Sequence, residues 1–210
     1  MVLDKILPNS AVAIIGLPLG GKEQLVLGFV QLKLKAKEPI LMLSTDKSPE
    51  DIKKEFLKSK VFIGSSETDG MLAFIDCYSA QVGESAKSTP SIKSVPGPLA
   101  LNEISIALSE IEKEFLKKNQ RHNIIFNSVS TLLMYSNPQA IGRFLQVIIA
   151  KAKKAGGTIL LTLEEGMHAP DVLVSMEHLV DEIIFVKSKD GKLFVKARGV
   201  KGFEDWKEFT

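Results

Sequence analysis

Gly16-Leu17-Pro18-Leu19-Gly20-Gly21-Lys22-Glu23 is the stretch of this sequence that decides the fold. It matches the phosphate-loop pattern GxxxxGK[ST] up to the last position, where Glu23 supplies a carboxylate instead of a hydroxyl. In that pattern glycines let backbone N–H groups wrap a phosphate, the lysine reaches the outer phosphates, and the hydroxyl holds Mg²⁺. The stretch therefore predicts a strand, a phosphate-binding turn and a helix, with an altered metal position.

The segments on either side of this loop alternate between strand and helix patterns. Residues 11–15 form a short apolar, β-branched run, and residues 24–35 have the mixed apolar face of a helix. Apolar runs predict further buried strands at 40–43, 71–75, 123–126 and 158–163. Helical spacing predicts helices from Pro49 through Leu57, with Ser48 as the cap, from Asn102 as a cap through Phe115, and over 138–154.

The remaining segments predict two loops and a hairpin. Residues 81–98 are rich in Ser, Pro and Gly without an apolar period, which is typical of a long loop, and 164–174 is also expected to be a loop. Asp190-Gly191 separates the apolar runs 183–186 and 193–195, a strong hairpin signal. The expected fold is therefore one α/β domain over residues 1–210, with a mainly parallel sheet, helices on both faces and a C-terminal antiparallel hairpin.

The composition excludes several classes of protein. Hydrophobic residues make up 45% and charged residues 25%, as in ordinary globular chains, and the formal net charge of +2 is too small to indicate a nucleic-acid or membrane partner by itself. No apolar run reaches the roughly 18 residues that span a membrane, and residues 1–10 do not resemble a signal peptide. We therefore expect a cytoplasmic protein. Its Lys-rich, Arg-poor composition is compatible with a thermophilic archaeon.

Cysteine and histidine do not predict a metal site. The single Cys77 excludes an internal disulfide and is expected to be a small buried residue. His122, His168 and His178 have no ligand spacing with each other or with Cys77. No residue is therefore assigned as a metal ligand.

The order of these segments resembles the RecA-type ATPase fold, and specifically the archaeal and bacterial proteins similar to KaiC and RadA. The resemblance covers nearly the whole chain. The matching stretches are Gly16 to Lys22, Leu43 to Asp51, Phe74 to Ser79, Ile124 to Leu133, Leu160 to Glu164 and Val195 to Gly199.

The resemblance implies a nucleotide site and also exposes losses in it. It assigns Gly16, Gly20 and Gly21 to the phosphate loop and Lys22 to the phosphate-gripping lysine. Leu19 stands where the family usually has glycine, so it adds a Cβ and restricts the backbone. Glu23 replaces the Mg²⁺-binding hydroxyl.

Two more positions near the expected metal depart from the family pattern. Asn127 stands at the end of the fourth strand, where the family has an Asp that holds the Mg²⁺ water shell. Asp46 stands where the family has a catalytic Glu that orients the attacking water, and Lys47 replaces a second carboxylate. An ordinary helix-entry turn is the alternative interpretation of Asp46.

Lys196 and Arg198 alternate along one strand and so point to the same side. In the resembled family this Lys-x-Arg pair reaches the nucleotide of a neighbouring subunit, as an arginine finger does. The alternative is an edge strand protected by two exposed charges.

Three functions follow as hypotheses. The first is a KaiC-like regulatory or scaffolding protein that forms a homo-oligomer or associates with a related ATPase and does not hydrolyse nucleotide efficiently. Its degenerate phosphate loop is then either an inherited structural turn or a weak site for ATP or ADP, with Mg²⁺ as the candidate ion. The second is a divergent ATPase that uses Glu23 or Asp46 at the metal. The third, a nucleic-acid binder, is disfavoured because the expected loops at 135–140 and 164–177 contain no Lys or Arg.

Overall fold

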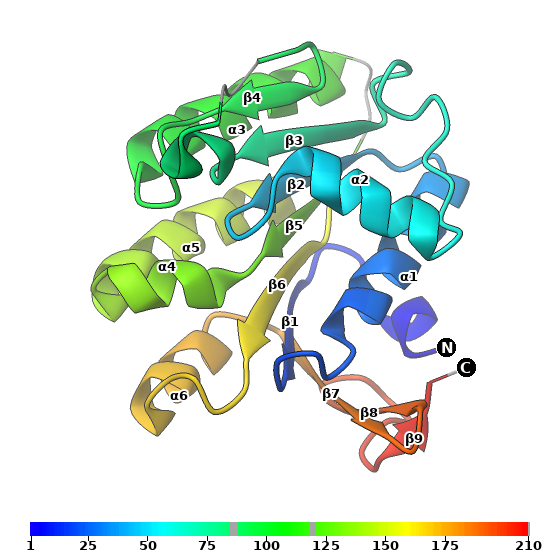
Figure 1. The fold of residues 1–210 in the computed structure, drawn as a ribbon. Coiled ribbons are helices and arrows are strands. Elements are labelled where there is room, and N and C mark those ends of the chain that lie inside the picture. The colour runs from blue at the N-terminus through cyan, green and yellow to red at the C-terminus, as the bar shows by residue number, and fades with distance from the viewer. Residues whose placement is uncertain (85–87, 118–120, 210) are drawn as a thin grey trace.

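A single sheet runs through the part of the chain that the computed structural model describes, residues 1–84, 88–117 and 121–209. Its nine strands have the order β4-β3-β2-β5-β6-β1-β7-β8-β9 (Figure 1). The strands are β1 (Ala11–Gly16), β2 (Ile40–Ser44), β3 (Leu72–Asp76), β4 (Ile92–Ser94), β5 (Asn123–Asn127), β6 (Ile159–Glu164), β7 (Glu182–Lys189), β8 (Lys192–Arg198) and β9 (Lys207–Glu208). Strands β1 to β7 pair in parallel, and β7, β8 and β9 pair antiparallel.

Helices cover both faces of the sheet. They are α1 (Lys22–Lys35), α2 (Pro49–Lys58), α3 (Leu101–Lys117), α4 (Val129–Tyr135), α5 (Pro138–Lys154) and α6 (Pro170–Glu177), with short 3₁₀ turns η1 (Val2–Lys5) and η2 (Ser79–Val82). In Figure 1, α1 and α2 lie in front of the sheet. The expected mainly parallel sheet with helices and a closing hairpin is confirmed.

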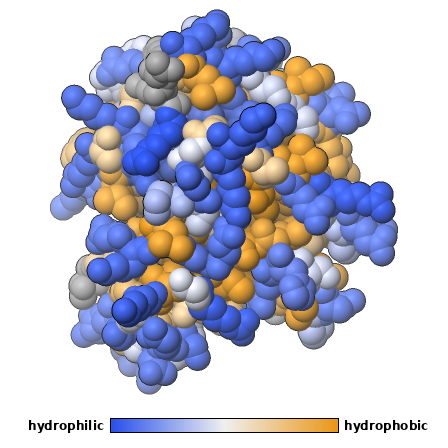
Figure 2. All heavy atoms as spheres, turned by 180° about the vertical axis from the view of Figure 1, so that it is seen from behind, coloured by the Kyte–Doolittle hydropathy of each residue, from blue (hydrophilic) through white to orange (hydrophobic). Residues whose placement is uncertain are grey.

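Alternation along the buried strands divides the core into two layers. In β1, Ala11, Ala13 and Ile15 face the layer formed with α3, α4, α5 and α6, whereas Val12 and Ile14 face the layer formed with α1, α2 and η1. Successive strand side chains point to opposite faces, so a strand covered on both sides is apolar throughout. Figure 2 shows the molecule from behind, on the side away from α1 and α2, where apolar patches lie between hydrophilic side chains.

Two of the predicted local signals, the Asp190-Gly191 hairpin turn and the Ser48 helix cap, are confirmed. Asp190 and Gly191 adopt φ values of 53° and 73° and join β7 to β8 in a two-residue loop, as a tight hairpin requires. Ser48 caps α2 by accepting the N–H of Asp51 at 3.2 Å. Asn102 is not a cap, because α3 already begins at Leu101. That prediction was wrong.

Two predicted loops contain regular structure. Within 81–98, Ile92 pairs with Phe74 and forms the edge strand β4, while residues 85–87 of that segment lie outside the described residues. In the predicted loop 164–174, residues 165–169 form a loop, but the prediction was wrong for residues 170–174, because α6 begins at Pro170. A three-residue strand and a two-turn helix are too short to show a period of their own, and tertiary contacts define them.

No helix among the described residues is both long enough and apolar enough to cross a membrane.

A buried carboxyl group holds the segment that precedes β1. Glu182 is 1% exposed, and its Oε1 accepts the N–H of Leu7 at 2.9 Å, whereas its Oε2 has no partner among the described residues. Burial raises the pKa of Glu182, and the nearby Asp181 carboxylate adds to that rise although the Leu7 N–H opposes it. Folding therefore disfavours the charged form of this carboxyl group relative to the unfolded chain.

Glu182→Gln is expected to stabilise the fold at neutral pH by on the order of 1 kcal/mol, because it removes a half-satisfied buried charge and keeps the acceptor for Leu7. A raised folded-state pKa gives stability that is present at acidic pH and is lost as pH rises through that pKa. The gain in Tm should therefore be present at pH 7 and shrink toward acidic pH. Thermal melts across this range test it, and a gain independent of pH would contradict the titration of Glu182.

Candidate functional site

The glycine loop between β1 and α1 is closed upon itself. The Gly20 N–H donates to the Leu17 carbonyl at 2.9 Å, and a Cβ on Gly20 would lie 2.7 Å from that oxygen, so only glycine fits. Gly21 has a φ of 103°, which also favours glycine, and Leu193 of β8 packs directly against it. Leu19 adopts a φ of 58° with its side chain 93% exposed. The Gly20 N–H is therefore directed into the loop rather than toward a ligand.

Lys22, the first residue of α1, is buried and fully engaged. Its Nζ donates to the carbonyls of Gly16 and Leu17 at 3.1 and 2.9 Å, and to Glu164 Oε2 at 2.7 Å. Its side chain is only 4% exposed. An ammonium group has three protons to donate. All three therefore have partners within the protein.

Glu164 occupies the place beside Lys22 because of the sheet order. It ends β6, which is the parallel neighbour of β1, and the register pairs it with Gly16. Parallel strands bring their carboxyl ends to the same edge, and ligands bind at that edge in open α/β sheets. Its backbone is held there by Ser130, whose Oγ accepts the Glu164 N–H at 2.8 Å. The carboxylate is thus fixed at the edge where a phosphate would have to enter.

His168 contacts the serine that holds the Glu164 backbone. Its Nε2 lies 2.8 Å from Ser130 Oγ, the same hydroxyl that holds the Glu164 backbone. Burial lowers the pKa of His168, although the Glu164 carboxylate acts in the opposite direction. Since Ser130 is 1% exposed, this Ser–His contact supports the loop and does not present a nucleophile to solvent.

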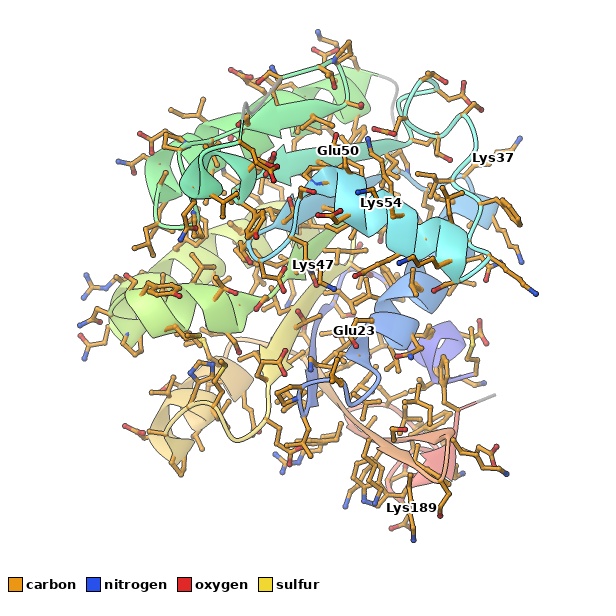
Figure 3. The ribbon with its side chains drawn as sticks, viewed as in Figure 1. Glu23, Lys37, Lys47, Glu50, Lys54 and Lys189 are labelled. Atoms are coloured by element: carbon orange, nitrogen blue, oxygen red, sulfur yellow. The ribbon has the colours of Figure 1, made fainter. Side chains whose placement is uncertain are left out.

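A pocket opens beside Lys22 at the carboxyl ends of β2, β5 and β6, between α1 and α2. Charged and polar side chains line its mouth: Lys22, Glu23, Asp46, Lys47, Asn127 and Glu164. Glu23 on α1 and Lys47 after β2 lie near one another in this region (Figure 3). The space has a volume of about 40 Å³, which holds only a few water molecules at roughly 10–15 Å³ each. A nucleotide could enter only after these side chains had moved.

Asp46 and Asn127 are in direct contact at the mouth of the pocket. Asn127 Nδ2 donates to Asp46 Oδ1 at 3.0 Å, and Thr45 Oγ1 lies 2.6 Å from the Asn127 carbonyl. Asp46 is solvent-accessible, but it lies within the concave mouth. Desolvation there raises the pKa of Asp46, while the positive charge of Lys47 opposes that rise.

Lys47 is paired across the pocket with α2. Its Nζ donates to Glu55 Oε1 at 2.7 Å. Burial disfavours its charged form, but the hydrogen bond to Glu55 and the charges of Glu55, Asp46 and Glu23 outweigh burial and raise the pKa of Lys47. The two lysines at the pocket therefore each have an acidic partner.

The structure brings most of the sequence-predicted site residues together. Gly16, Gly20 and Gly21 form the loop, and Lys22, Glu23, Asp46 and Asn127 line the pocket. Lys196 and Arg198 lie elsewhere, on β8. Arg198 pairs with Ile183, level with Ala13 rather than with Gly16, and its Nη1 donates to Glu177 at 2.9 Å.

The donor set does not assemble into a metal centre. Among the described residues, no group of three or more His, Cys, Asp or Glu side chains lies close enough to hold a metal ion. Glu23 and Asp46 could each offer oxygen ligands, the type that Mg²⁺ prefers, but Asp46 already accepts a hydrogen bond from Asn127. In this conformation the residues do not fit a Mg-nucleotide.

Sequence reasoning did not select Glu164 as a site residue, nor Glu55, Ser130 or His168. The signal for Glu164 was available, because a carboxylate ends the apolar run 158–163. What was missing was the pairing of that run with β1, which places Glu164 opposite Gly16.

Comparisons with known proteins add a family and a fold. A protein-family model described as a family of unknown function (DUF7504) matches residues 35–186. No curated protein matched the sequence. Among 472 matching chains of solved structures is the crystal structure of uncharacterized protein PH0321 from Pyrococcus horikoshii in complex with an unknown peptide. It has a TM-score of 0.75 and 18% identity, covering 98% of this chain and 89% of that chain. A likeness at this identity shows the fold alone.

Proposed function

Since this chain belongs to the family of unknown function DUF7504, we propose a function from its own residues: a RecA-type, KaiC-like domain that acts as a regulatory or scaffolding protein and not as an efficient ATPase. The observation that carries the proposal is the Lys22–Glu164 ion pair at 2.7 Å. The Glu164 carboxylate takes the hydrogen bond from Lys22 that a bound phosphate would need. The RecA-type assignment is supported by the loop pattern at Gly16–Lys22 between a central parallel strand and a helix.

Electrostatics opposes a phosphate at this loop. A carboxylate about 4 Å from a phosphate charge costs about 1 kcal/mol in water and about 4 kcal/mol at an effective dielectric near 20. Glu164 and Glu23 both border the site, and Asn127 brings no negative charge to attract a cation. Phosphoryl transfer depends on positioning and on charge neutralisation by a metal and by Lys or Arg. ATP hydrolysis is therefore disfavoured in two ways: Lys22 is already paired with Glu164, and Glu23 and Asn127 replace the residues that would hold the metal in the resembled family.

Two exposed leucines in the loop between β1 and α1 support association with another protein. The loop presents Leu19 with 93% of its side chain exposed, and Leu17 beside it is 55% exposed. Exposed apolar side chains of this size are candidates for protein contacts. The solved neighbour of this fold was crystallised with an unknown peptide, which is in keeping with a protein-binding role for the present chain. We propose a second copy or a related ATPase subunit as the partner.

The proposal predicts that ATP or ADP binds the wild-type protein weakly, with dissociation constants of about 1 mM or above, and that Mg²⁺ does not tighten binding. Isothermal titration with and without Mg²⁺, alongside a phosphate-release assay, measures both properties. Lys22→Ala should leave the phosphate-release rate at background. Mg-dependent hydrolysis that Lys22→Ala abolishes would instead establish the divergent ATPase that uses Glu23 or Asp46.

A further inference from the structure

The antiparallel corner formed by β7, β8 and β9 has one buried and one open face. Val186, Val195 and Ala197 point into the core layer shared with α1 and α2, and each is at most 3% exposed. The register pairs Lys187 with Phe194 and Lys189 with Lys192, so these residues share the opposite face. In Figure 1 the labels of β8 and β9 lie at the lower right, and those of α4 and α6 at the left. On this face Lys189 and Lys192 are exposed, and Lys187, Phe194 and Lys196 are partly exposed.

Five cations stand on this open face. By the alternation of the strands they are Lys187, Lys189, Lys192, Lys196 and Arg198. Lys192 is paired with Glu208 and Arg198 with Glu177. Lys187, Lys189 and Lys196 form no ion pair with any described residue.

Aromatic rings lie between these cations. The Lys187 ammonium lies 3.9 Å from the centroid of the Trp206 ring, which places Trp206 on the same face, and Trp206 is 41% exposed. Phe194 is half-buried and belongs to neither core layer of the described residues. Phe185 lies at the base of the face, with the Arg198 guanidinium 5.1 Å from its ring. A strand surface with rings beside unpaired lysines has the chemistry to stack bases and to contact phosphates.

An acidic protein is the alternative occupant of this face, and it would pair with the lysines but not with the aromatic rings. It would leave unexplained why the exposed Trp206 and the half-buried Phe194 lie among the cations of this face. Nucleic-acid bases use both features, because every base has a stacking face and every nucleotide a phosphate. A duplex hides its bases, so a single strand fits the open face better.

We propose that the open face of β7, β8 and β9 binds single-stranded nucleic acid, with Phe194 and Trp206 stacking bases and Lys187, Lys189 and Lys196 contacting phosphates. This surface is distinct from the expected loops at 135–140 and 164–177, which lack basic residues. The inference does not depend on the state of Lys22, so the two proposals fail separately.

The single tryptophan of the chain makes a direct test available. Trp206 is the only Trp, so a thymidine oligomer of about 20 nucleotides should quench its fluorescence as it binds. Lys187→Gln, Lys189→Gln and Lys196→Gln together should weaken binding of the labelled oligomer at least about tenfold at about 50 mM salt, and lower the slope of log K against log salt by about 2. Trp206→Ala, read by anisotropy of the label, should weaken binding by about fivefold or more.

A matched triple variant separates this face from general charge. Lys35→Gln, Lys58→Gln and Lys113→Gln remove the same charge from exposed positions on α1, α2 and α3, and affinity should change less than about twofold if the hairpin carries binding. Equal losses in both triples, or no anisotropy change with wild-type protein at low salt, would overturn the proposal. Quenching of Trp206 by polyglutamate without binding of the oligomer would assign the face to an acidic protein instead.

Discussion

Glu164→Gln is expected to tighten the binding of ATP or inorganic pyrophosphate by about tenfold or more. The reason is charge. Glu164 Oε2 lies 2.7 Å from Lys22 Nζ, so a negative group already pairs with the lysine that would bind a phosphate. Removing a like charge at about 4 Å from a phosphate is worth between about 1 and 4 kcal/mol, and about 1.4 kcal/mol corresponds to tenfold in affinity. Isothermal titration of the wild-type protein and of Glu164→Gln in the same buffer measures the difference in affinity.

Glu165→Gln is the matched control for this experiment. It removes the same charge one residue further along the chain, where the side chain is exposed, and it retains the backbone bond from the Glu165 N–H to Gly16 O at 2.9 Å. Its affinity should stay within about twofold of wild type. If the two variants behave alike, the occupation of Lys22 by Glu164 is not what keeps phosphate out.

Adding Glu23→Thr and Asn127→Asp to Glu164→Gln tests the metal position that the resemblance implies. The triple variant restores the hydroxyl and the carboxylate of the resembled family and frees Lys22. Mg-dependent tightening of ATP binding should occur in the triple variant and not in Glu164→Gln alone. Its absence would mean that closure of the loop around Gly20, and not the metal position, limits the site.

Gly157→Ala is expected to destabilise the fold by about 3 kcal/mol or more. A Cβ at Gly157 would lie 1.6 Å from the backbone carbonyl oxygen of His122, immediately before β5. Backbone cannot rotate away as a side chain can, and the Thr158 N–H bond to Asn123 Oδ1 at 3.1 Å ties the two segments together. Since 1 kcal/mol shifts Tm by about 2–4 °C in a chain of this size, the loss in Tm should be about 6 °C or more.

Gly142→Ala provides the comparison within the same fold. Gly142 is inside α5, and a Cβ there would make only an ordinary contact, 3.7 Å from Met176 Cε. Alanine in a helix interior is favoured over glycine by about 0.5–1 kcal/mol, so this variant should be as stable as wild type or more stable. Denaturant titrations of both variants check the pair. A small effect at Gly157 would show that the joint between His122 and Gly157 can open.

The predictable part of the site came from residues adjacent in sequence. The strand, loop and helix around Gly16–Glu23 follow from a glycine pattern between two apolar segments. Asp46 and Asn127 both line the pocket, because each follows a buried strand and parallel strands end at one edge. Lys196 and Arg198 were not brought to the pocket of their own chain, and their proposed reach into a neighbouring subunit stays a prediction.

By itself the sequence determined the alternation of strands and helices, the Asp190-Gly191 hairpin and the glycine turn between β1 and α1, because these depend on local periodicity and on the backbone freedom of glycine. Only the tertiary structure decided that Lys22 is held by Glu164, 142 residues away, and that Phe194 and Trp206 share a face with unpaired lysines. Both depend on which strands become neighbours. That choice is made by burial of the whole sheet, which no single segment encodes.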